Sequence, residues 1–233
     1  MFTSILRLYS KAVMLQSLTR SIREYIHLWR AFFHSPYNVL STIIGVALLE
    51  TSYRITTSLA VYATKNAGAP LNDIVFSYIG RVDTSIIHGD LSFLLFDLRY
   101  ILFFILIYYA PFATKALAFL ILFRACVINL TQLGMPDGIV PIASSITFGG
   151  DLFFSGHVAN TFMLALIFWD KRYLRFFFIG ISIVFGIAAV IGRYHYSIDV
   201  IAAPFFAYGI FAITKKWLRR DYTLLQSGHK GVK

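Results

Sequence analysis

Residues 174–192 read LRFFFIGISIVFGIAAVIG and contain one charged side chain, that of Arg175. A helix needs about 20 mostly apolar residues to cross the roughly 30 Å of hydrocarbon in a bilayer. This stretch has that length and composition, and similar stretches recur along the chain. The sequence predicts six transmembrane helices, over residues 38–63, 91–110, 112–133, 154–170, 174–192 and 196–214. The predicted fold class is all-α, a six-transmembrane-helix bundle.

The overall composition favours a membrane protein over a soluble one. Of the 233 residues, 58% are hydrophobic and 14% are charged, and the mean hydropathy is +0.70. Ordinary soluble domains are about 45–50% apolar and about 25% charged. The net charge of +10 comes chiefly from Lys and Arg before the first apolar stretch and after the last. Basic residues that flank apolar spans set the orientation of a protein in the membrane and attract anionic lipid. We therefore predict no nucleic-acid partner.

The basic residues also predict the orientation in the membrane. The N-terminal segment, the turn at 170–175 and the C-terminal tail are rich in Lys and Arg, whereas residues 64–90 and 134–153 carry more acidic than basic side chains. Segments rich in Lys and Arg stay on the cytoplasmic side. We therefore expect both termini to be cytoplasmic and residues 64–90 and 134–153 to be extracytoplasmic. This topology fits a bacterial inner membrane, or a Golgi or plasma membrane in a eukaryote.

The N-terminal residues predict an additional amphipathic helix that lies on the membrane surface. Apolar side chains recur there at helical spacing with arginines between them, at Leu15, Leu18, Ile22, Tyr25 and Trp29. A plain cytosolic extension is the alternative. The predicted organisation is a cytoplasmic amphipathic segment, a six-span membrane domain and a basic cytoplasmic tail, over residues 1–37, 38–214 and 215–233.

Two segments on the extracytoplasmic side carry candidate catalytic residues. The first ends in Ser155-Gly156-His157 at the start of the fourth predicted span. Free backbone N–H groups at a helix start attract anions such as phosphate, and Ser155 is a suitable capping residue. A capped helix with a histidine at the lipid–water interface is the alternative interpretation.

The second segment is His195-Tyr196-Ser197-Ile198-Asp199. Residues four apart share a helix face, so the Asp199 carboxylate can reach a ring nitrogen of His195 and fix its tautomer. A purely structural hydrogen bond is the alternative. An ionisable group at membrane depth costs at least about 2.5–3.5 kcal/mol, which makes two such segments at one depth more consistent with a shared functional site.

The paired motifs resemble those of a known family. Gly-Asp-x-x-x-Ser-Gly-His at 150–157 and His-Tyr-Ser-x-Asp-Val at 195–200 are similar to the signatures of the sphingomyelin synthase family, a branch of the type 2 phosphatidic acid phosphatase superfamily. Residues 70–73 with 78–82, and Arg124 ahead of 136–138, resemble two further family motifs. The resemblance extends over about residues 38–214.

Several positions depart from the superfamily patterns. Ala188-Ala189 stand where its phosphatases carry Ser-Arg, and a Lys-x6-Arg-Pro motif is missing, both of which favour the synthase branch. Asn72 replaces a proline of that branch, Gly149 stands where a cysteine is common, and the loop before the fourth span is short. These departures leave the choice of substrate open.

The resemblance implies transfer of a phosphocholine-like head group from a glycerophospholipid donor to a lipid alcohol such as ceramide. His195, oriented by Asp199, would form a phosphohistidine, and His157 would act first as acid and then as base. No cofactor and no metal are expected. The candidate residues for binding the phosphate or head group are Ser155, Gly156, Asp151, Arg124 and Asp97.

Alternatives remain open for individual residues and for the function. Arg124 either neutralises phosphate or pairs with another buried group, and Asp97 lies within possible reach of His157. A lipid phosphatase or phospholipase C-like hydrolase would use the same site with water in place of the lipid alcohol. A non-enzymatic lipid-binding protein would keep the scaffold without needing both histidines. The sequence does not determine the oligomeric state.

Overall fold

The computed structural model describes residues 23–137 and 152–230, and all regular secondary structure in these ranges is helical. Residues 23–33 are helical and precede α2. The elements that follow are α2 (Pro36–Lys65), α3 (Ile74–Tyr78), η1 (Ile87–Leu91), α4 (Ser92–Ile105), η2 (Ile107–Tyr109), α5 (Ala110–Thr131), α6 (Gly156–Ile167), α7 (Arg172–Ile191), α8 (Ser197–Trp217) and α9 (Arg219–Lys230).

Four helices are long and apolar enough to cross a membrane, so the chain is an integral membrane protein. The four are α2, the continuous segment made of η2 and α5, α7, and α8. They match four of the predicted spans. By contrast, α4 has 14 residues and α6 has 12, fewer than the about 20 that a straight crossing needs. Residues 85–91, which include the π-helical η1, are also helical and lead without a break into α4, whereas irregular backbone at residues 152–155 precedes α6. The count of six spans stays a prediction.

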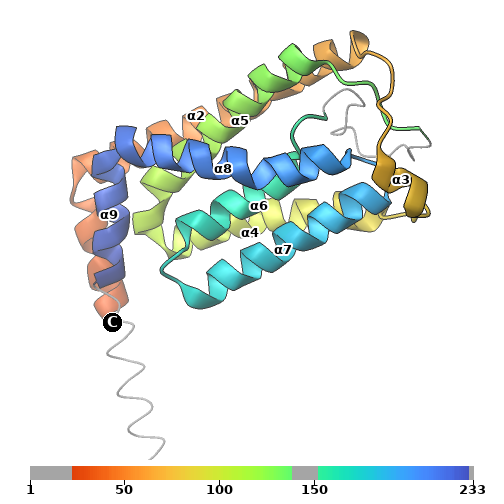
Figure 1. Ribbon diagram of the computed structural model, residues 1–233. Coiled ribbons are helices and arrows are strands. Elements are labelled where there is room, and N and C mark those ends of the chain that lie inside the picture. The colour runs from red at the N-terminus through yellow and green to blue at the C-terminus, as the bar shows by residue number, and fades with distance from the viewer. Residues whose placement is uncertain (1–22, 138–151, 231–233) are drawn as a thin grey trace, which may run out of the picture.

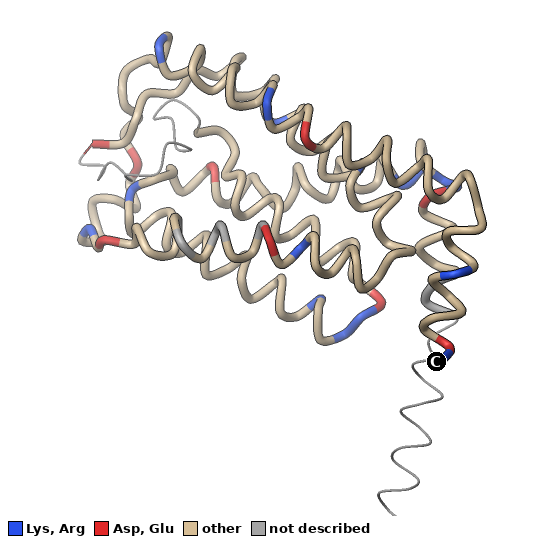
Figure 2. The backbone as a smooth tube through the Cα atoms, turned by 180° about the vertical axis from the view of Figure 1, so that it is seen from behind, with Lys and Arg blue, Asp and Glu red and all other residues tan. Residues whose placement is uncertain are grey.

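The chain reverses direction at each step through α2, α4, α5, α6, α7 and α8, which form one bundle (Figure 1). Both candidate histidines lie at the end formed by residues 65–87, 131–137, 152–157 and 191–197, which we call the histidine end. The opposite end, formed by residues 105–110, 168–172 and 217–230, we call the basic end. The α6–α7 turn at the basic end carries a group of Lys and Arg residues (Figure 2). Which end faces the cytoplasm stays a prediction.

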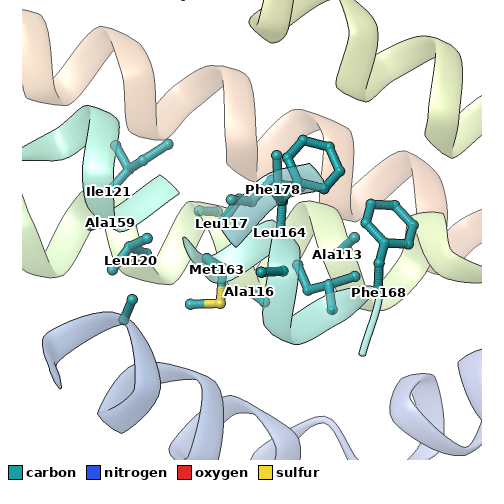
Figure 3. Packing of buried hydrophobic residues seen from close by; sticks show 14 of the residues in the cluster. Ala113, Ala116, Leu117, Leu120, Ile121, Ala159, Met163, Leu164, Phe168 and Phe178 are labelled. Carbon is teal, nitrogen blue, oxygen red and sulfur yellow. The ribbon is translucent and has the colours of Figure 1, made fainter. Parts of the chain in front are cut away.

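The core of the bundle is centred on α5, which contacts α2 along much of its length. Small side chains allow this close approach: a Cβ at Gly45 of α2 would collide with the hydroxyl of Thr114 on α5. Buried residues of α5, α6 and α7, among them Ala116, Met163 and Phe178, pack against one another in one hydrophobic cluster (Figure 3). Because lipid is as apolar as these side chains, tight van der Waals packing holds such helices together.

The helix at residues 23–33 is held against the basic end. Trp29 packs edge-on against Phe104 of α4, with ring centroids 4.6 Å apart, and the Tyr108 hydroxyl donates to the Leu28 carbonyl at 3.2 Å. Leu15, Leu18 and Ile22 of the predicted surface helix lie outside the described residues. The amphipathic surface helix therefore stays a prediction.

A buried ion pair fixes α9 to the bundle. The Lys115 ammonium on α5 lies 2.7 Å from the Asp221 carboxylate, which also accepts hydrogen bonds from the hydroxyls of Tyr37 and Ser41 on α2. Burial alone would raise the pKa of the Asp221 carboxyl, but the hydrogen bonds from Lys115, Ser41 and Tyr37 outweigh burial and hold this pKa below its ordinary 3.8. The network joins α2, α5 and α9 at the basic end.

Replacing Lys115 by Met should destabilise the protein strongly, because a buried carboxylate then loses its partner. Breaking such a pair costs about 3–5 kcal/mol. The stabilisation from Asp221 is complete above its ordinary pKa of 3.8 and is lost as pH falls through its lower folded-state pKa. Thermal unfolding in detergent at neutral pH should show a large drop for K115M, partly recovered in K115M/D221N. The exposed Lys216→Met serves as control, and equal losses in both single variants would contradict this role.

Candidate active site

The two histidine segments meet at the histidine end. The Ser155 backbone N–H donates a hydrogen bond to the Asp199 carbonyl, with a distance of 3.1 Å between nitrogen and oxygen. Ser155 precedes His157 by two residues, and Asp199 follows His195 by four. Helices α6 and α8, which begin at these segments, start at the same end of the bundle (Figure 1). Tertiary structure thus brings together two motifs that are distant in the sequence.

Ser155 occupies the N-cap position of α6 and is fully buried. We expected its hydroxyl to cap the helix, but the side chain makes no capping hydrogen bond. Within the described ranges the hydroxyl oxygen has no hydrogen-bond partner at all. The first turn of α6 therefore presents backbone N–H groups and an unused hydroxyl at one place, which suits an anionic ligand.

Arg124 reaches from α5 to the start of α6. Its Nε donates to the Phe154 carbonyl at 2.6 Å, and the side chain is buried. A Cβ placed on Gly156 would lie 3.2 Å from both Cζ and Nε of Arg124, so the guanidinium rests directly on this glycine. The contact with Phe154 is structural, and the position next to Gly156 puts a positive charge where phosphate binding was predicted. Both interpretations of Arg124 are compatible with this geometry.

His195 and Asp199 are both buried and face each other. The distance from His195 Nδ1 to Asp199 Oδ2 is 3.5 Å. The same oxygen accepts the Tyr196 backbone N–H at 3.0 Å, so Asp199 also stabilises the first turn of α8. The Ala189 carbonyl accepts the N–H groups of Tyr194 and His195 and fixes the turn that carries the histidine. At this distance Nδ1 makes no hydrogen bond to a described residue, but it is the ring nitrogen paired with the carboxylate, which leaves Nε2 for chemistry.

Asp73 lies at the candidate site, although we assigned it no role from the sequence. Its carboxylate accepts the Ser197 backbone N–H at 2.6 Å and the Ser197 hydroxyl at 3.1 Å, and it caps α3 by accepting from the Val75 N–H. The only sequence indication was that residues 70–73 fall in a stretch that resembles a family motif. Asp73 thereby ties the loop after α2 to the segment that carries His195.

Tyr196 joins three loops at the same place. Its hydroxyl donates to the Gly134 carbonyl at 2.8 Å and accepts from the Leu71 N–H at 2.8 Å, while its ring stacks on Phe76. A Cβ at Gly134 would collide with the backbone of residues 68–69, so glycine is required for this approach. The side chain next to His195 is therefore immobilised by contacts from the ends of α2 and α5.

His157 lies beside a small cavity between α4, α5, α6 and α7. Its ring packs against Phe185, with centroids 5.2 Å apart. Arg99, which we had not assigned to the site, also lines this cavity and donates to the hydroxyls of Tyr53 and Tyr100. Asp97 is exposed on α4, so the residue of that helix beside His157 is Arg99.

Two further expectations concern residues and ligands. Asp151 lies outside the described residues, and its predicted role stays a prediction. In residues 23–137 and 152–230 there is no group of three or more His, Cys, Asp or Glu side chains able to hold a metal ion. A mechanism without metal likewise stays a prediction.

In comparisons with known proteins, one family model matches part of the chain. A family model described as PAP2 superfamily, C-terminal, matches residues 149–216, which include both histidine motifs and helices α6 to α8. This match supports the type 2 phosphatidic acid phosphatase superfamily. Neither a curated protein nor a solved structure matches the chain. The class defined is an integral membrane protein in which residues 149–216 are similar to that superfamily.

Replacing Asp73 by Ala should loosen the segment that carries His195. The variant loses the acceptor for the Ser197 N–H and hydroxyl and the α3 cap, so we expect a loss of about 1–3 kcal/mol. Hydrogen exchange measured by mass spectrometry should accelerate over residues 195–199. Asp83→Ala is the matched control, since Asp83 accepts from Ser85 in its own exposed loop. Unchanged exchange in D73A would show that the Ser197 contact does not hold this segment.

Proposed function

We propose that the protein is a lipid phosphotransferase of the sphingomyelin synthase type, which moves a head group from a glycerophospholipid to a lipid alcohol. The observation that carries the proposal is the direct hydrogen bond between the Ser155 N–H and the Asp199 carbonyl, which puts the two histidine motifs side by side. The match of residues 149–216 to the superfamily supports lipid phosphatase or phosphotransferase chemistry in general. The choice of the synthase branch rests on the sequence motifs.

The first step is attack by His195 on the donor phosphodiester. Nε2 forms a bond to phosphorus, and the bond from phosphorus to the diacylglycerol oxygen breaks. His157 gives its proton to that departing oxygen. Asp199, 3.5 Å from Nδ1, stabilises the positive charge that develops on the His195 ring.

The second step releases the head group to the acceptor. The hydroxyl oxygen of the lipid alcohol attacks phosphorus, His157 takes the hydroxyl proton, and the bond from phosphorus to His195 Nε2 breaks. Gly156 offers its backbone N–H and Ser155 its hydroxyl to the phosphoryl oxygens, and Arg124 supplies a fixed positive charge next to them. Asp151 and Asp97 complete the predicted head-group set.

The test is product analysis with purified protein and a phospholipid labelled at phosphorus, with and without ceramide or diacylglycerol. Transfer predicts a labelled lipid product that requires the acceptor. If the label appears only in water-soluble phosphate esters, the protein is a hydrolase and the transferase proposal is wrong. Donor binding without any turnover across a broad panel of phospholipids would favour a lipid-binding protein.

The histidines should fail at different steps. His195→Ala should give no labelled protein and no product, because the nucleophile is missing. His157→Ala should slow turnover about 10²–10⁴-fold, the usual contribution of a general acid or base. Gel electrophoresis measures the acid-labile label bound to the protein, and this label distinguishes the two variants. His34→Ala at the basic end is the control, and a loss of turnover in it equal to that of His195→Ala would contradict the assignment.

A further inference from the structure

An open groove lies between the helix at residues 23–33 and α4, at the basic end of the bundle. It is lined chiefly by Tyr25, Ile26, Trp29, Arg30, Phe33 and Phe104, and we call it the aromatic groove. Its volume is about 610 Å³, within the range of about 300–1,000 Å³ that is usual for sites of small molecules. The candidate active site lies at the opposite end, so the proposed phosphoryl transfer makes no use of this groove.

The wall of the aromatic groove is held in place before any ligand binds. The helix at residues 23–33 lies across the long helices at the basic end (Figure 1). The Tyr25 hydroxyl attaches it to the end of α4 by donating to the Ile105 carbonyl at 2.7 Å. Tyr25, Trp29 and Phe33 are spaced four apart on one helix face, and neighbouring ring centroids in this row are 6.1 and 5.5 Å apart. A preorganised wall of this kind reduces the entropy that binding costs.

The apolar side chains of the groove are open to an apolar ligand. Ile26, Phe33 and Phe104 are 47%, 54% and 65% exposed. Contiguous exposed apolar surface marks a place where a membrane or another apolar partner binds. Tyr and Trp side chains, such as Tyr25 and Trp29, are typical of the boundary between hydrocarbon and water. The groove therefore suits the part of a phospholipid where an acyl chain joins its head group.

Arg30 gives the groove a positive charge. The side chain is exposed, and it forms no ion pair with an acidic residue in residues 23–137 or 152–230. Glu24, the acidic residue of the same helix, does not line the groove. A guanidinium can donate two parallel hydrogen bonds to the oxygens of a phosphate. A zwitterionic head group adds a cation that Arg30 repels, so a lipid with net negative charge complements the groove better.

We propose that the aromatic groove binds one anionic phospholipid from the leaflet at the basic end. Its acyl chain packs against Trp29, Phe33 and Phe104, and its phosphate accepts hydrogen bonds from Arg30. The basic end is predicted to be cytoplasmic, and anionic lipids give the cytoplasmic leaflet its negative surface potential. Because the groove and the histidines lie at opposite ends, this lipid is not the donor of the proposed reaction. The inference therefore does not depend on the proposed function.

The test uses Trp29 as a reporter in the full-length protein in phosphatidylcholine vesicles at low salt. Trp169→Phe and Trp217→Phe leave Trp29 as the single tryptophan. Phospholipids with brominated acyl chains quench tryptophan fluorescence on contact, so quenching measures their binding in the groove. Brominated phosphatidylglycerol should bind about fivefold more tightly than brominated phosphatidylcholine, the usual gain from one basic residue at a membrane surface. Equal quenching by the two lipids, or weak quenching by both, would overturn the proposal.

Arg30→Gln should abolish the preference for phosphatidylglycerol. Arg23→Gln is the matched control, because Arg23 is an exposed arginine of the same helix that does not line the groove. Both variants lower the net charge by one, and R23Q should keep the preference. Equal losses in R30Q and R23Q would show a diffuse attraction between a basic helix and anionic lipid, and would overturn the specific site. Both side chains are exposed, so we expect unchanged thermal unfolding in both variants, which checks that each is folded.

Discussion

The hydrogen bond from the Ser155 amide to the Asp199 carbonyl joins the starts of α6 and α8, and the arrangement of both histidine motifs depends on it. Asp199 participates through its backbone and its side chain: the carbonyl holds α6, while the carboxylate holds the Tyr196 N–H and faces His195. Because this residue is fully buried, water does not compete for these contacts. A displacement of α8 relative to α6 would therefore disturb both segments at once.

The two ends of the bundle are fixed by different kinds of interaction. At the histidine end, Asp73 and Tyr196 connect short loops to the start of α8 through hydrogen bonds. At the basic end, the Lys115–Asp221 ion pair attaches α9 to α5 and α2. Between them, small side chains of α5 allow neighbouring helices to pack closely. Polar contacts also join helices between the two ends: Arg99 on α4 donates to the Tyr53 hydroxyl on α2, and the Ser182 hydroxyl on α7 donates to the Val158 carbonyl on α6.

The candidate site draws on more of the chain than the part similar to the superfamily. Residues 149–216 contain both histidines and Asp199, but Arg124 comes from α5 and Arg99 from α4. Helices α4 and α5, which precede the matched segment, thus bring positive charge to a site whose predicted acid–base and nucleophilic groups lie within residues 149–216. In a medium of low dielectric constant, fixed positive charge stabilises the negative charge that develops during phosphoryl transfer.

The sequence by itself determined the long apolar helices α2, α5, α7 and α8. A run of about 20 mostly apolar residues is a local property of the sequence and does not depend on how the helices pack. It also singled out His157, His195 and Asp199, but only as types of residue at given spacings. Tertiary structure alone decided that Ser155 meets Asp199 and that Asp73 binds Ser197. It also decided the short length of α6, which irregular backbone at residues 152–155 precedes. Periodicity along a chain says which residues share a face; which faces meet depends on how the helices pack in three dimensions.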